Sequence, residues 1–206
     1  KSLDPAARCR ARVRRGRSHY RERDYAKAAA VYRKVLAHCD VSTAPDPRIR
    51  SLYALGRRHY HLEHFAKSRS RFEQLLEEFP ERSHADDALM FLGRAARELG
   101  KPEREKRLLE RALEDYPGGD MVHEFVWEHV ESLYRSGKFA TFIERLETLD
   151  LPDRDDEYFS QGRLAYFRGR AEQHLGNDAA AITAWKRAWT RYPFSFYGYL
   201  SHGALR

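Results

Sequence analysis

Apolar residues recur at spacings of three and four along most of the chain, with charged residues between them. This spacing places apolar side chains on one face of a helix, and no stretch shows a competing strand pattern. The pattern therefore predicts an all-α fold. The expected paired helices cover residues 8–39, 48–80, 85–117, 121–149 and 158–193, and the start of a further helix covers 194–206.

Small residues, turns and prolines repeat in step with these pairs. Four expected first helices contain a glycine that allows close approach of the partner helix: Gly16, Gly56, Gly93 and Gly169. Gly100, Gly137 and Gly176 follow, where a left-handed residue would end the helix. Three second helices should stop at an aromatic residue followed by proline, because proline cannot continue a helix. These pairs are Phe79-Pro80, Tyr116-Pro117 and Tyr192-Pro193.

This arrangement resembles the tetratricopeptide repeat across nearly the whole chain. The spacing is 40 residues from Gly16 to Gly56 and 37 from Gly56 to Gly93, longer than the 34 residues usual for that repeat. The resemblance implies a right-handed superhelix of about five helical hairpins. Irregular loops are expected at 40–46 and 149–156. We expect residues 1–206 to form one α-solenoid domain, because each hairpin buries its face only against its neighbours.

The first helices of such a stack line its concave face, where aromatic rings here alternate with guanidinium groups. Rings supply rigid apolar contact, and guanidinium groups bind carboxylate or phosphate. Two interpretations stay open: packing of the rings between neighbouring helices, or a ligand role for some of these residues. The candidate binding residues are Arg17, Tyr20, Tyr53, Arg57, Tyr60, Arg94, Arg97, Trp127, Tyr134, Tyr166 and Arg170.

The net charge of +7 is concentrated at the beginning of the chain. Residues 1–37 contain twelve Lys and Arg residues against three acids. Such a segment favours an anionic partner by local attraction, or it is a solvated basic face. No apolar run approaches the roughly 20 residues of a membrane span, so no span is expected.

Cys9 and Cys39 are the only cysteines. Cys9 lies near the start of the first expected helix, and Cys39 lies at the end of its antiparallel partner. They are therefore close enough for a disulfide, which would suit an oxidising compartment. The alternative is two buried thiols.

No catalytic, metal-binding or cofactor motif is present. The densest histidine group is His59, His61 and His64, but His59 occupies a packing position on a different face from His61, and zinc needs three or four converging ligands. Asp86-Asp87 and Asp155-Asp156 are expected to cap helix starts rather than to form a catalytic pair. We therefore predict no catalytic residues, no metal and no cofactor.

Three segments resemble the helical-repeat region of soluble lytic murein transglycosylases. They are Gly118–Met121 with Glu124 and Trp127, residues 162–171, and Tyr192-Pro193-Phe194-Ser195-Phe196-Tyr197-Gly198-Tyr199-Leu200. The resemblance implies a periplasmic module that binds or positions peptidoglycan for an attached catalytic domain. That family's catalytic Glu-Ser precedes a Gly-Leu-Met-Gln motif. The Glu131-Ser132 pair lies inside a repeat helix without that motif, so no catalytic role transfers and the chain itself is not expected to be an enzyme.

The main alternative is a cell-envelope scaffold that binds a peptide or helix of a partner protein. Nucleic acid is not an expected partner, because helical repeats that read RNA bases need regular short units. The expected ligands are thus peptidoglycan, another anionic glycan or peptide, or a partner protein.

Overall fold

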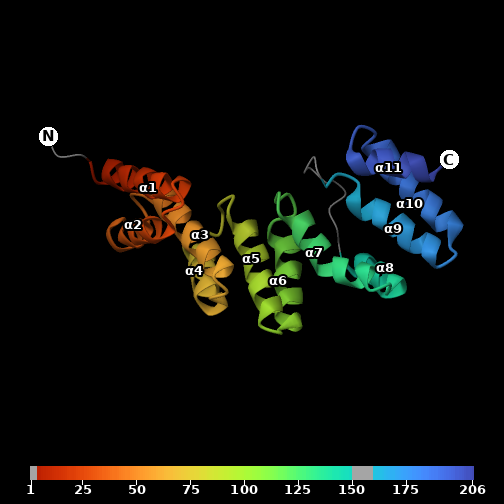
Figure 1. Cartoon of the computed structure of the whole chain (residues 1–206), viewed down its shortest axis with the longest axis horizontal. Coiled ribbons are helices and arrows are strands. Elements are labelled where there is room, and N and C mark those ends of the chain that lie inside the picture. Colours follow the sequence, from red (N-terminus) through yellow and green to blue (C-terminus); the bar gives the residue numbers. More distant parts are fainter. Residues whose placement is uncertain (1–3, 150–159) are drawn as a thin grey trace. The chain divides into compact units, whose positions relative to one another are not determined.

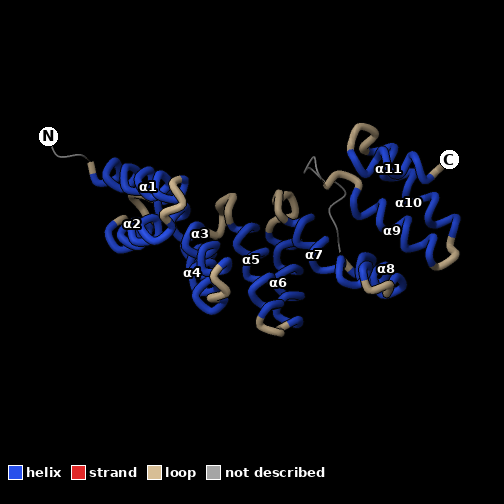
Figure 2. The backbone as a smooth tube through the Cα atoms, in the orientation of Figure 1, coloured by secondary structure: helices blue, strands red, loops and turns tan. Residues whose placement is uncertain are grey.

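The computed structural model describes residues 4–149 and 160–206 (Figure 1). Within these ranges the chain forms eleven α-helices and no strand (Figure 2), which confirms the all-α prediction. The chain divides into two compact units, residues 1–108 and 109–206, and each is described by itself. A single domain over 1–206 stays a prediction.

Short turns connect the helices in pairs, close to the predicted boundaries. The first unit contains α1 (Pro5–Arg21), α2 (Tyr25–His38), α3 (Pro45–His61), α4 (Phe65–Glu78), α5 (Ala85–Glu98) and the start of α6 (Pro102–Asp115). The second unit contains the end of α6, then α7 (Val122–Arg135), α8 (Phe139–Thr148), α9 (Arg163–His174), α10 (Asp178–Arg191) and α11 (Phe196–Ala204). Helices α4, α6 and α10 stop before the three aromatic–proline pairs, as predicted. Most of the loop expected at 149–156 lies outside the described residues.

A glycine on the first helix of a hairpin receives an aromatic ring from the second helix. A β-carbon at Gly16 would lie 2.6 Å from the Tyr32 ring, and one at Gly56 would lie 2.7 Å from the Phe72 ring. Both distances are shorter than real carbon contacts. Glycine is therefore required at these positions, because any side chain would push the two helices apart.

The turns inside the hairpins use the left-handed conformation. Gly100, Gly137 and Gly176 have φ of 66°, 72° and 79°, as predicted. In the first two hairpins the same position is held by Arg23 and Glu63, with φ of 61° and 57°. These two residues adopt a backbone region that usually favours glycine, so their residue types do not predict the turn.

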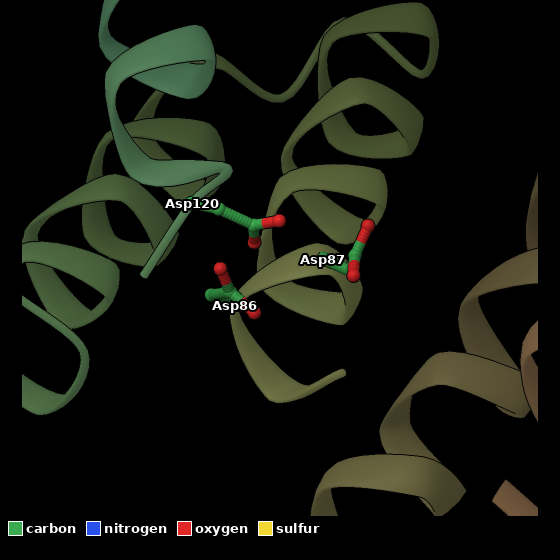
Figure 3. A group of neighbouring side chains, drawn as sticks. All are labelled: Asp86, Asp87 and Asp120. Carbon is green, nitrogen blue, oxygen red and sulfur yellow. The ribbon is translucent and has the colours of Figure 1, made fainter. Parts of the chain in front are cut away.

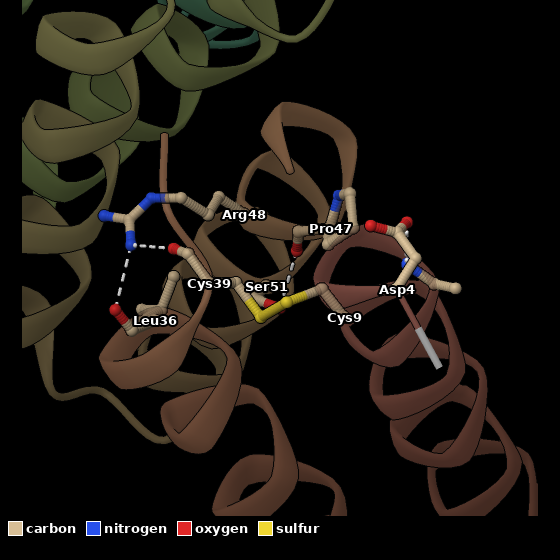
Figure 4. The surroundings of a disulfide bond; sticks show 8 residues. Asp4, Cys9, Leu36, Cys39, Pro47, Arg48 and Ser51 are labelled. Carbon is tan, nitrogen blue, oxygen red and sulfur yellow. Dashed lines mark hydrogen bonds between the residues drawn. A yellow bond between two sulfur atoms is a disulfide. The ribbon is translucent and has the colours of Figure 1, made fainter. Parts of the chain in front are cut away.

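Arg48 ties three helices together. From α3, its Nη1 donates to the carbonyls of Leu36 and Cys39 at the end of α2, at 2.8 and 2.9 Å (Figure 4). Its Nε and Nη2 bind the carboxylate of Glu78 in α4 at 2.9 and 2.5 Å. Burial alone would raise the pKa of Glu78, but hydrogen bonds from Arg48 and Gln74 outweigh it and lower that pKa. The guanidinium thus satisfies free helix-end carbonyls that would otherwise be buried without partners.

A disulfide joins Cys9 of α1 to Cys39 at the end of α2, with Cα atoms 5.9 Å apart (Figure 4). Both residues belong to a small buried cluster with Val13, Val35 and Ala44. The bond therefore closes the open end of the first hairpin, opposite its turn.

Replacing Gly56 with alanine should destabilise the first unit. Phe72 is fully buried, so it cannot retreat from the new methyl group. We expect the free energy of unfolding to fall by about 1–3 kcal/mol, despite the better helix propensity of alanine. Urea unfolding followed by circular dichroism measures the change. Gly203→Ala in α11 is the matched control, since nothing lies within 4 Å of a β-carbon there. Equal losses for both variants would contradict the ring-to-glycine interpretation.

Removing the disulfide should loosen the first hairpin. The two cysteines are 30 residues apart in sequence, and closing a loop of this size stabilises a fold by about 3–4 kcal/mol in the chain-entropy treatment. The Cys9→Ser, Cys39→Ser double variant should therefore unfold at clearly lower temperature. Thiol titration of the denatured wild-type chain, purified without reductant, should find no free thiol. Two reactive thiols would show that the cysteines are unbridged.

Candidate functional site

Four candidate residues of the first unit gather around Phe91, a buried residue of α5: Tyr53, Arg57, Tyr60 and Arg94. The Phe91 ring stacks on Phe72 with centroids 5.0 Å apart and planes 4° apart. The ring centroids of Tyr53 and Tyr60 in α3 lie 6.1 and 5.6 Å from that of Phe91, both in T-shaped geometry. Spacing in the sequence does not predict a site role for Phe91, because Phe91 lies in the continuous apolar run from Leu89 to Leu92, where any of the side chains could join the ring cluster.

Two guanidinium groups lie beside this ring. The Cζ atoms of Arg57 and Arg94 are 5.7 and 4.8 Å from the Phe91 centroid, and Arg57 is also 5.6 Å from the Tyr53 centroid. These are cation–π distances. Arg57 is exposed and Arg94 is partly exposed. The pair therefore combines an apolar floor with positive charge at the surface, an arrangement that suits a carboxylate.

Tyr53 connects the ring cluster to the beginning of α5. Its hydroxyl donates to Oδ1 of Asp87 at 2.9 Å. Burial, together with the negative charge of Asp87, raises the pKa of Tyr53 well above the ordinary value for tyrosine. Tyr53 is therefore held as a neutral donor under ordinary conditions.

Asp86 and Asp87 lie at the start of a helix, as expected, although neither is its N-cap residue. Both lie in the first turn of α5 (Figure 3), where negative charge suits the helix dipole. The N-cap residue is His84, which makes no side-chain cap hydrogen bond. Asp155 and Asp156 lie outside the described residues.

The other candidates of the first unit have more local contacts. Arg97 binds the buried carboxylate of Glu105 at 2.5 Å, which makes it a structural partner of α6. Tyr20 is exposed and packs edge-on against Tyr25 with centroids 5.2 Å apart. Arg17 is exposed in α1. These three residues do not join the cluster around Phe91.

The second unit has its own ring cluster, centred on Phe167 of α9. The ring centroids of Trp127, Tyr134, Tyr166 and Tyr197 lie 4.6, 4.8, 5.2 and 5.9 Å from that of Phe167. Three of these four residues were candidates, and the structure brings them together. Phe167 and Tyr197 were not predicted as members of this cluster. Phe167 is the sequence neighbour of Tyr166, and Tyr197 reaches the cluster only through the packing of α11 on α9.

Arginines in this second cluster are less accessible. Buried Arg163 lies 5.0 Å from the Trp127 centroid and binds Glu124 at 2.8 Å. Arg170 Nη1 donates to the Tyr166 hydroxyl at 3.4 Å, and its Nε is buried without a hydrogen-bond partner. Burial raises the pKa of both Tyr134 and Tyr197. Packing therefore accounts for most of this cluster, and ligand binding by its residues stays a prediction.

The three histidines considered as metal ligands do not converge. His59 is half-buried and its ring centroid is 6.0 Å from that of His64, whereas His61 is exposed beside Tyr60. Burial and the neighbouring His64 lower the pKa of His59. Among the described residues, the ligand atoms of these histidines do not form a group at metal-binding separation.

The fold is a series of helical hairpins, three of which are closed by a glycine–ring contact, and this is the architecture of a repeat scaffold. A family model described as tetratricopeptide repeat matches residues 8–43 and 53–120, so the chain belongs to the tetratricopeptide-repeat family. Members of this family are generally non-enzymatic scaffolds that bind peptides or partner proteins. Within the described residues, no helix has the length and apolar character needed to cross a membrane.

Solved structures support the same fold. A MamA crystal structure has a TM-score of 0.56 at 17% identity, covering 90% of this chain and 92% of that one. A putative kinesin light chain from Podosopora anserina, with nearly identical tetratricopeptide-like repeats, has a TM-score of 0.53 at 17% identity and 90% and 95% coverage. YrrB, described as having an unusual peptide-binding site, has a TM-score of 0.50 at 16% identity and 93% and 90% coverage. No curated protein matches the sequence.

The raised pKa of Tyr53 gives a pH-dependence prediction. Because folding holds the proton on the phenol, this contribution to stability is complete below the unfolded pKa of about 10 and is lost as pH rises above it. We expect the free energy of unfolding of the wild type to fall from pH 8 to pH 11, and this fall to be smaller in Tyr53→Phe. The variant should also be less stable than the wild type by about 1 kcal/mol at pH 8, because it loses the hydrogen bond to Asp87. Tyr20→Phe, an exposed tyrosine in the same unit, is the control. An identical alkaline slope in the wild type and Tyr53→Phe would contradict the prediction. Urea titrations at each pH provide the measurement.

Proposed function

We propose that the chain is a non-catalytic interaction scaffold whose first unit binds a carboxylate-bearing peptide of a partner protein beside Phe91. The observation that carries the proposal is the placement of Arg57 and Arg94 at 5.7 and 4.8 Å from this buried ring. A carboxylate would bind the guanidinium groups, and a neighbouring apolar side chain would contact the exposed parts of the ring cluster.

Contrast with other arginines favours this face over the rest of the molecule. Arg48, Arg97 and Arg163 each bind a carboxylate of this chain at 2.5 to 2.9 Å, which occupies them structurally. Arg57 is exposed and lies over two rings, Tyr53 and Phe91. The charge of Arg57 is therefore accessible to a ligand, and its guanidinium group is positioned by contact with the two rings.

We place this scaffold in an oxidising compartment such as the bacterial periplasm or cell envelope. The Cys9–Cys39 disulfide supports the assignment, because disulfides persist in oxidising compartments and are rare in reducing ones. The sequence resemblance to periplasmic repeat proteins points the same way.

A second candidate is a peptidoglycan-positioning module of a lytic transglycosylase. Its support is the sequence of residues 192–200, since the comparisons with known proteins extend only to the repeat family. The Ser195 hydroxyl accepts from Gly198 N at 2.9 Å and donates to the Gln161 carbonyl at 3.0 Å, and Gly198 packs on the Tyr192 carbonyl. These contacts dock α11 on its neighbours, so a structural role accounts for much of this segment.

Binding should depend on the two arginines beside Phe91. Peptides selected from a random 12-residue library on the wild-type chain should be enriched in acidic residues, and their affinity should fall as salt rises. Arg57→Ala with Arg94→Ala should weaken binding about tenfold or more, since about 1.4 kcal/mol corresponds to a factor of ten. Isothermal titration calorimetry measures the change.

The matched control removes the same charge from another surface. Arg33 and Lys34 are exposed in α2, and their double alanine variant should bind almost as tightly as the wild type. Equal weakening in both double variants would reduce the effect to net charge and contradict a defined site. Sedimentation with purified sacculi tests the second candidate: retention of the wild type but not of the Arg57→Ala, Arg94→Ala variant would favour peptidoglycan as the ligand.

A further inference from the structure

Arg57 and Arg94 are two members of a row of three arginines in the first unit. Each member directly follows the glycine that recurs in the first helices of the hairpins. The members are Arg17 in α1, Arg57 in α3 and Arg94 in α5. Helix α3 contacts both α1 and α5, so the same position of three neighbouring helices carries an arginine. We call these three residues the arginine row.

Exposure belongs to this position of the repeat rather than to one helix. Arg17 and Arg57 are exposed, and Arg94 is partly exposed. Helix α3 has packed neighbours on both sides, and Arg57 is exposed there all the same. In the part of the chain that the structure describes, neither Arg17 nor Arg57 forms an ion pair with a carboxylate. Both charges are therefore accessible to a ligand.

The spacing of the row matches one conformation of an extended peptide. The Cζ atoms of Arg57 and Arg94 lie 5.7 and 4.8 Å from the same ring centroid, that of Phe91. They are therefore at most about 10 Å apart, in agreement with the distance between the axes of packed helices. A chain in the polyproline II conformation has three residues per turn and rises about 3.1 Å per residue, so every third side chain points the same way at intervals of about 9 Å.

Positive charge increases along the row from α5 to α1. Helix α5 contains two arginines and three acidic residues, α3 contains four and one, and α1 contains seven and none. Arg14 and Arg21 are three and four residues from Arg17, so they share its face of α1, and both are exposed. The ring cluster around Phe91 lies at the opposite, less basic end. The row therefore combines an apolar contact at one end with increasing positive charge toward the other.

We propose that the ligand of the first unit is a polyproline II segment of a partner protein with a carboxylate at every third residue, and that successive carboxylates bind Arg94, Arg57 and Arg17. An apolar residue beside the first carboxylate contacts the ring cluster around Phe91. The inference rests on the proposed peptide site beside Phe91 and extends it to Arg17. Nucleic acid fits less well, because each strand carries a charge about every 3.4 Å along the duplex and has no repeat that matches the row.

Two peptides of equal composition test the spacing. The register peptide is Leu-Glu-Pro-Pro-Glu-Pro-Pro-Glu, and the clustered peptide is Leu-Glu-Glu-Glu-Pro-Pro-Pro-Pro. Each is capped, fluorescently labelled and titrated with the 206-residue chain at low salt, and anisotropy measures binding. Because net charge and composition are the same, a difference in affinity reports the spacing alone. We expect the register peptide to bind about fivefold more tightly, as one well-placed surface ion pair allows.

Variants of α1 test the part played by Arg17. Arg17→Ala should weaken binding of the register peptide about fivefold. Arg15→Ala removes the same charge from another exposed position of α1 and should weaken it less than about twofold, since this residue lies on a different face of the helix. Changing the last glutamate of the peptide to glutamine should abolish the effect of Arg17→Ala, because both changes then remove one contact.

Equal affinities for the two peptides, no binding of the register peptide, or equal effects of Arg17→Ala and Arg15→Ala in chains that circular dichroism shows to be folded would overturn the inference. The proposed site beside Phe91 is judged separately, by the library-selected peptides and the Arg57→Ala, Arg94→Ala variant, so it can stand when the extension to Arg17 fails. A polyphosphate chain is the competing ligand. If it binds more tightly than the register peptide and loses affinity with Arg17→Ala, the row belongs to a phosphate polymer and the assignment to a peptide is overturned.

Discussion

The contact between a glycine and an aromatic ring determines how three of the hairpins close: Gly16 with Tyr32, Gly56 with Phe72 and Gly169 with Trp185. Gly56 shows its consequences: the absent side chain lets the Phe72 ring lie on the backbone of α3 and lets Ser68 donate to the Gly56 carbonyl at 3.0 Å. The distance between the helices is thus set by a ring thickness rather than by interlocking side chains. In the fourth hairpin, buried Val130 and Leu146 stand at the equivalent positions. Here a valine replaces the glycine and a leucine replaces the larger ring, so the pair fills a volume similar to that of a glycine and a ring, as expected where packing density is conserved.

The same contact extends from the fold to the candidate site. One face of Phe72 closes the second hairpin on Gly56, and the ring also stacks on Phe91, which lies beside the two arginines. The floor of the proposed peptide site is therefore continuous with the core of the hairpin. In the second unit, Trp185 covers Gly169 and donates from Nε1 to the carbonyl of Tyr166 at 3.2 Å. Within each unit, the rings that close a hairpin and the rings of the candidate site are consequently parts of one network.

Spacing in the sequence was enough to predict the helices, because a repeating pattern reports the same buried face several times. It identified the close-approach glycines Gly16, Gly56 and Gly169, the turns after α5, α7 and α9, and the helix ends at aromatic–proline pairs, while the same role for Gly93 stays a prediction. It could not identify Arg23 and Glu63 as left-handed residues, since their side chains carry no signal of that conformation. It also missed Phe91 and Phe167. Each lies beside another apolar or aromatic residue, and only the rotation of the packed helix decides which of two neighbours turns toward the cluster.

The roles of the arginines are harder to predict from the sequence than the helices are. Whether an arginine binds a carboxylate of the same chain or lies at the surface depends on its burial. A buried guanidinium needs a carboxylate partner, because an unpaired buried charge costs several kcal/mol; Arg163 with Glu124 and Arg48 with Glu78 meet that need. An arginine over a ring at the surface has no such requirement, because water and the ring together stabilise its charge. Arg57 is of this second kind. Local sequence around a repeat cannot separate the two kinds, since the carboxylate of a buried pair comes from another helix about 30 to 40 residues away. Once these internal partners are known, Arg57 is distinguished by its exposed position over the Tyr53 and Phe91 rings, which is why it carries the proposed binding role.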